Sequence, residues 1–217
     1  SNNIFIGKKA GYANSSTSGR SIFIGYQAGA NNAGNYNLFI GYNAGQANTL
    51  GVGNMLTGYY AGYSNTEGSY NIFTGYYAGY SNTTGEHNQF VGYRAGDSNT
   101  TGSENYFTGY QAGDSNTTGS ENYFSGYQAG YSNRASSNHF SGYKAGYFNT
   151  FGTQNQFVGN EAGNKNTTGI SNTFSGYHAG FSNTTGSYNY AAGTDAGYSN
   201  LTSSNNVYIG HEAGYSN

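Results

Sequence analysis

The sequence predicts an all-β protein: a parallel β-solenoid, or a β-roll of the same kind, with 13 coils of about 17 residues each. Three observations predict this fold. One short motif recurs at nearly constant spacing along all 217 residues. Gly, Asn, Ser, Thr and Tyr dominate the repeat, so its helix propensity is poor. The repeat is too short for a pair of helices, but it can hold one or two short strands between turns.

The repeat is anchored on a Gly that follows a Phe-x pair, and no spacer separates one copy from the next. We therefore expect a single continuous repeat domain over residues 1–217, as a segment of a longer fibre. Within each copy, the segment around x-F-x-G-Y-x-A-G is expected to form strand, and S-N-T-T-G has the chemistry of a turn. The anchor glycines are Gly7, Gly25, Gly41, Gly58, Gly75, Gly92, Gly109, Gly126, Gly142, Gly159, Gly176, Gly193 and Gly210.

Five columns of the repeat are nearly fixed. Two positions before the anchor, Phe predicts an internal ladder of rings. Ala and Gly follow three and four positions after it, where a methyl fits beside the ladder and Gly supplies a positive φ or a close backbone approach. Seven positions after it, Asn tolerates the left-handed conformation, and its amide can bond to the amides above and below. Asn also precedes the anchor by four positions in 12 copies. The central members of the ladders are Phe73, Phe90, Phe107, Phe124, Asn82, Asn99, Asn116 and Asn133.

The position directly before the anchor holds only small or β-branched residues, and none is charged. It points to the strand face opposite the Phe ladder. Because fixing a whole coil costs more backbone entropy than one buried Phe returns, we expect this second face to be buried too. This predicts a homo-oligomer, most simply a homotrimeric rod; the alternative is a monomer with a β-prone outer face. Neither end of the repeat resembles a cap, so we expect either flanking domains or subunits that join end to end into a filament. The predicted protomer interface is Ile6, Ile24, Ile40, Thr57, Thr74, Val91, Thr108, Ser125, Ser141, Val158, Ser175, Ala192 and Ile209.

Tyrosine follows the anchor directly in nine copies and recurs five positions after it. Such ladders have rigid apolar rings with polar tips. They predict a surface for glycans or for lateral fibre contacts; the alternative is that ring stacking only stabilises the solenoid. The candidate ladder is Tyr26, Tyr42, Tyr59, Tyr76, Tyr93, Tyr110, Tyr127, Tyr143 and Tyr177.

Two other surface roles stay open. Threonine recurs eight positions after the anchor, and a Thr rank on a stiff solenoid is the device of some ice-binding proteins. Seven N-x-[ST] sequons coincide with the Asn column, so N-glycosylation is an alternative use of these residues. The Thr rank is Thr49, Thr66, Thr83, Thr100, Thr117, Thr150, Thr167 and Thr184.

The repeat unit NxFxGYxAGxSNTTGxx, as in residues 88–104, resembles the N-x-x-x-G repeats in the heads of YadA-like trimeric adhesins. It is more similar to the N-T-T-G-containing repeats of phage and bacterial tail-fibre-like proteins. Its longer period and its Phe core depart from the adhesin pattern. The resemblance implies an extracellular, cell-surface or virion location and a structural role in a fibre or filament. An adhesin head that binds glycans is the alternative, and no catalytic residues come with either family.

The sequence gives no sign of an enzyme, a cofactor or a metal centre. The four histidines fall in four different columns, the glycines lack phosphate-binding spacing, and cysteine is absent. Two stacked acid pairs, Asp97 with Asp114 and Glu104 with Glu121, leave weak Ca²⁺ binding as an alternative. With a net charge of -2 and no long apolar run, we expect neither a nucleic-acid partner nor membrane insertion.

Overall fold

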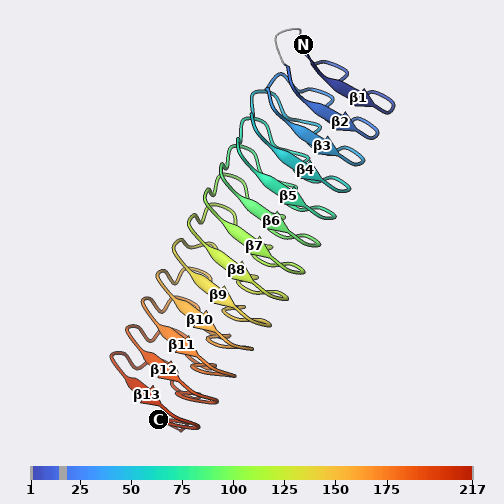
Figure 1. Ribbon diagram of the computed structural model, residues 1–217. Helices are drawn as coiled ribbons and strands as arrows, with labels where there is room; N and C mark the ends of the chain where they lie inside the picture. Colours follow the sequence, from blue (N-terminus) through green and yellow to red (C-terminus); the bar gives the residue numbers. More distant parts are fainter. Residues whose placement is uncertain (1, 15–18, 217) are drawn as a thin grey trace. The chain divides into compact units, whose positions relative to one another are not determined.

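The structure, a computed structural model of the chain, describes residues 2–14 and 19–216. It divides into two compact units, Ser1–Thr108 and Gly109–Asn217, and each is described by itself. Every repeat contributes one three-residue strand, and the turns of its coil extend from the two ends of that strand (Figure 1). The single continuous domain expected from the unbroken repeat stays a prediction.

Within each unit, consecutive strands pair in parallel, and each residue lies beside its counterpart in the next repeat. The predicted all-β parallel solenoid with a repeat of about 17 residues is therefore confirmed. The first unit holds β1 (Ile4–Ile6), β2 (Ile22–Ile24), β3 (Leu38–Ile40), β4 (Met55–Thr57), β5 (Ile72–Thr74), β6 (Gln89–Val91) and β7 (Tyr106–Thr108). The second unit holds β8 (Tyr123–Ser125), β9 (His139–Ser141), β10 (Gln156–Val158), β11 (Thr173–Ser175), β12 (Tyr190–Ala192) and β13 (Val207–Ile209).

The Phe ladder forms the apolar core, as predicted. The middle residue of each strand points inward because side chains alternate along a strand. The rings of Phe73 and Phe90 are fully buried and stack with their centroids 4.8 Å apart and an interplanar angle of 5°. Leu56 takes the same place between Phe39 and Phe73 and is also fully buried.

The Ala-Gly pair fits against this ladder for both of the predicted reasons. Ala78 is fully buried, and Gly79 has a φ of 58°. A Cβ at Gly79 would lie 2.5 Å from ring carbons of Phe73. Gly79 is therefore required both by its left-handed backbone and by the ring of its own coil.

The invariant Asn column forms a buried ladder of amides, as predicted. The Asn82 amide nitrogen donates to the Asn65 side-chain oxygen at 2.7 Å and to the Gly85 carbonyl at 3.0 Å. The Asn82 oxygen in turn accepts from the Asn99 amide at 2.7 Å. These three Asn side chains are fully buried, so each polar atom depends on the coils above and below.

The expected left-handed backbone at these Asn residues is wrong. Left-handed non-Gly residues occur instead two positions after the anchor, as at Tyr77 (φ 58°), and five positions before it, as at Tyr70 (φ 57°). These two positions flank the strand, where the chain enters and leaves the turns. The Asn column lies outside the strand, after the first of these positions, as Asn82 follows Tyr77. Its side chain, and not a left-handed backbone, makes its contribution to the fold.

The second Asn column, four positions before the anchor, makes a different ladder. The backbone N–H of Asn88 donates to the Asn71 side-chain oxygen at 2.9 Å, and the Asn88 amide donates to the Gly102 carbonyl at 2.8 Å. Ser21 is the one exception in this column. Its hydroxyl accepts the backbone N–H of Asn37 at 3.1 Å and so replaces the missing amide oxygen.

We predict that Asn82→Asp destabilises the fold by about 3 kcal/mol at neutral pH, because it removes two buried donors and adds a buried charge. Asn31→Asp makes the same change at an exposed residue of the same unit and should cost less than about 0.5 kcal/mol. Urea unfolding of the two variants measures the difference. Equal losses of stability would contradict a buried amide ladder.

Candidate ligand-binding surface

The tyrosines of the first unit that directly follow the anchor form one continuous stack. From Tyr26 through Tyr42, Tyr59 and Tyr76 to Tyr93, successive ring centroids lie 4.9–5.4 Å apart and nearly parallel. The last four rings remain 41–44% exposed. The ladder geometry exists as expected, while its role in binding glycans stays a prediction.

Two shorter tyrosine columns lie beside this stack. The ring of Tyr60 stacks on that of Tyr77 with their centroids 5.4 Å apart, and the ring of Tyr63 stacks on that of Tyr80 with their centroids 5.2 Å apart. Tyr77 also contacts Tyr76 at 4.6 Å and Tyr80 at 4.9 Å, so the three columns join laterally. We call this group the tyrosine surface; its members are Tyr59, Tyr60, Tyr63, Tyr76, Tyr77 and Tyr80.

The middle column of this surface was not predicted from the sequence. The position two after the anchor carries charged residues in many copies, which is typical of open solvent. In the structure, Tyr60 and Tyr77 are half-buried between the other two columns. The available signal was the motif GYYAGYSN, which occurs at residues 58–65 and again at 75–82.

The tyrosine surface ends at a hollow of about 360 Å³ lined by Tyr76, Tyr77, Tyr80, Tyr93, Arg94 and Asp97. The Arg94 guanidinium donates to the Asp97 Oδ2 atom from Nη2 at 2.9 Å and from Nε at 3.2 Å. The Asp97 side chain is only 14% exposed, and its Oδ1 atom is buried without a hydrogen-bond partner among the described residues. Burial raises the pKa of Asp97 above its usual value, even though Arg94 acts to lower it.

The remaining members of the predicted tyrosine ladder lie in the second unit and do not form one stack. Tyr110, Tyr127 and Tyr143 stack at 5.0 and 5.3 Å. Asn160 takes the place of Tyr in the next coil, where its side-chain oxygen accepts the backbone N–H of Tyr143 at 3.4 Å. Tyr177 lies beyond this interruption and packs against His178, with ring centroids 3.8 Å apart.

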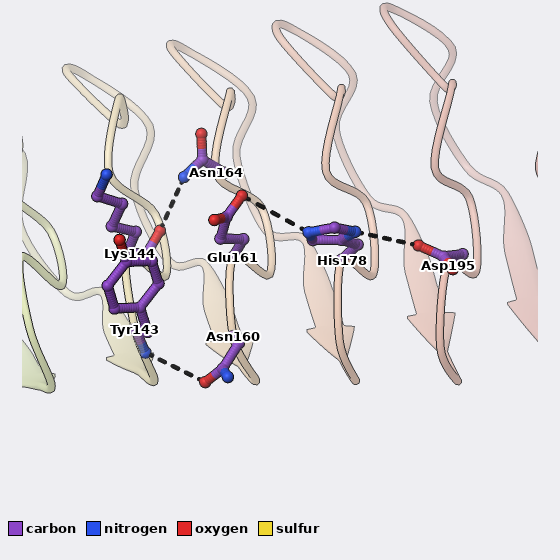
Figure 2. A network of polar contacts seen from close by, with 7 residues as sticks. All are labelled: Tyr143, Lys144, Asn160, Glu161, Asn164, His178 and Asp195. Atoms are coloured by element: carbon purple, nitrogen blue, oxygen red, sulfur yellow. Dashed lines mark hydrogen bonds and ion pairs between the residues drawn. The ribbon is translucent and has the colours of Figure 1, made fainter.

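A row of ionisable side chains follows the second unit from coil to coil (Figure 2). His178 Nε2 lies 3.6 Å from a Glu161 carboxylate oxygen, and Nδ1 lies 3.3 Å from an Asp195 carboxylate oxygen. Both ring nitrogens therefore face a carboxylate, and the row links three coils. Across the described parts of the chain, no three His, Cys, Asp or Glu residues are grouped to hold a metal ion.

The predicted interface column lies on the outer strand face together with the residues three positions before the anchor. In the single chain its members are half-buried or exposed; Ile6 and Ile209 are 56% and 70% exposed. Near β4 and β5 the same face presents Met55 and Ile72, which are 43% and 39% exposed. The outer face is thus apolar over these coils, and its burial by a partner stays a prediction.

Hydroxyls of the Thr rank and Asn side chains of the sequons form hydrogen bonds within the fold. The Thr66 and Thr83 hydroxyls donate to the Thr83 and Thr100 carbonyls at 3.1 and 3.0 Å. These donors are not directed to solvent, which counts against an ice-binding rank. The sequon amide of Asn82 is buried in its ladder, so a glycan there would disrupt the fold.

Comparisons with protein-family models, curated proteins and solved structures found no match. The resemblance to tail-fibre-like proteins and adhesin heads therefore remains an expectation based on the repeat. None of the described residues belongs to a helix with the length and apolarity to cross a bilayer.

We predict that alkaline pH destabilises the tyrosine surface. Loss of hydration among the packed rings raises the pKa of Tyr59, Tyr77 and Tyr80, and neighbouring phenols raise it further. Tyrosines of the unfolded chain ionise first, near pH 10. The contribution of the neutral rings is therefore complete below about pH 10 and is lost as pH rises through the raised pKa values. Thermal unfolding across this range, with tyrosinate absorbance, measures the effect.

The matched variant is Tyr59→Phe combined with Tyr77→Phe, which keeps the rings and removes two ionisable groups. It should lose less stability than the parent chain above about pH 10. A parent chain whose tyrosines titrate at their ordinary pKa would contradict the prediction.

Proposed function

We propose that this protein is a structural component of an extracellular or virion-borne fibre and associates with copies of itself. The observation that carries the proposal is the in-register repetition of every coil within each unit. Such a chain presents one surface many times at a spacing of about 4.8 Å. Repeat proteins use this regularity to build extended surfaces.

The outer strand face supports self-association. It carries exposed or half-buried Ile24, Ile40, Met55 and Ile72 beside small residues such as Thr74, without a layer of turns over them. A second copy has the same repeat, so its side chains can match this face at every coil. In a homotrimer about a shared axis, the outer face of each chain is covered by its neighbours.

Attachment to surface glycans is the second candidate function, and the tyrosine surface favours it. Tyr59 and Tyr76 keep 41% and 44% of their area exposed and bring polar tips beside apolar rings. Ice binding has less support, because the Thr hydroxyls donate to backbone carbonyls.

We predict that the purified chain sediments as a trimer, and that Ile24→Lys with Ile40→Lys converts it to monomer. Lysine charges would be desolvated in a contact between outer faces. Thr84→Lys adds the same kind of charge at an exposed turn of the same unit and should leave the trimer intact.

Sedimentation equilibrium gives the mass of all three proteins, and circular dichroism confirms that the variants are folded. A parent chain that is a well-folded monomer at micromolar concentration would overturn the proposal of self-association.

A further inference from the structure

Two tyrosine columns stop at the same level in the first unit. Tyr63 stacks on Tyr80, and the next coil places Asp97 at that column position. Tyr60 stacks on Tyr77, and the next coil places Arg94 there. Neither replacement is a ring, so each stack ends on a tyrosine whose next neighbour is a charged side chain.

The place of the missing ring is the hollow at the end of the tyrosine surface. Tyr80 and Tyr77 bound it where their stacks end, and Tyr76 and Tyr93 continue past it in the neighbouring column. Its polar side is the Arg94–Asp97 ion pair. A guest in this place would contact aromatic carbon on one side and a charged donor–acceptor pair on the other.

We propose that the hollow formed by Tyr77, Tyr80, Arg94 and Asp97 binds a neutral hexopyranose, whose ring takes the place of the missing tyrosine in the stack. This inference rests on the attachment role proposed above. It does not depend on self-association.

The polar groups of the hollow select among ring-shaped guests. The Arg94–Asp97 pair presents donor and acceptor groups to the hollow, and an apolar aromatic ring can satisfy neither. A cationic guest would lie beside Arg94, and an anionic guest beside Asp97. A pyranose meets both demands, since its C–H face packs on an aromatic ring and its hydroxyls both donate and accept.

Burial of the Asp97 carboxylate supports a site here. Its raised pKa means that the ionised form is disfavoured in the fold even with Arg94 beside it. A carboxyl group in a hollow whose pKa is shifted by burial beside a specific charged partner is a feature of functional sites.

In the second unit a tyrosine stack ends in a comparable way, but the residue that follows it in the column is not charged. Tyr131 stacks on Tyr147 at 5.0 Å, and the next coil places Asn164 in that column. The Asn164 amide donates to the Lys144 carbonyl at 3.1 Å (Figure 2), and the residue is only 6% exposed. This polar group is already satisfied by the backbone, so Tyr147 serves as the control.

The experiment titrates the 217-residue chain with the methyl glycosides of glucose, galactose, mannose and N-acetylglucosamine, and heteronuclear NMR follows the binding. We expect at least one glycoside to shift the signals of Tyr77, Tyr80 and Arg94. Tyr80→Leu and Asp97→Asn should each weaken that binding by at least about tenfold. Tyr147→Leu should leave it within about twofold.

Three results would overturn the inference. The first is that none of the four glycosides shifts the signals of the hollow. The second is that indole or tetramethylammonium saturates it while the sugars do not. The third is that Tyr80→Leu and Asp97→Asn bind the sugar as well as Tyr147→Leu, with all variants folded. Sedimentation of the same samples separates the proposals: an intact oligomer that binds no sugar removes the ligand site and leaves the fibre component standing.

Discussion

The buried amides of the two Asn columns are the constraint on which the rest of this structure depends. The Asn82 amide bonds to the coil before it and to the turn of its own coil, and its oxygen accepts from the coil after it. Burial of an amide without these partners would offset a large part of the free energy that stabilises the folded chain. These bonds form only when the corresponding side chains of successive coils lie beside one another, and this requirement keeps the strands in register.

Register then determines what every other column can hold. The Phe rings stack because each lies directly beside the next, and the glycines are required by what surrounds them. At Gly75, a Cβ would lie 2.3 Å from the Gly92 carbonyl oxygen of the following coil. Variation is greatest on the outer strand face and in the turns. A candidate binding site forms where a column changes residue type. The Tyr stacks end in this way, and Arg94 and Asp97 occupy the next positions.

Much of the fold could be predicted because identical residues at fixed spacing can only stack on one another. The Phe ladder, the Ala-Gly pair and the Asn amide ladder all follow from that rule. The lateral contacts of Tyr77 with Tyr76 and Tyr80 do not, because they depend on a left-handed backbone two positions after the anchor. In the other coils that position holds Lys, Arg, Gln, Asn, Glu, Asp or His, so its composition suggested exposure to solvent. The pairing of Arg94 with Asp97 depends on the same turn and was missed for the same reason.

The central claim is that residues one repeat apart lie one coil apart. The chain has no cysteine, so two can be introduced at Asn31 and Ser98 for spin labels, at equivalent positions of two coils four steps apart in the first unit. Pulsed electron spin resonance should give one narrow distance of about 19 Å, four coils of about 4.8 Å each. A broad distribution, or a mean distance that does not correspond to four stacked coils, would contradict the account.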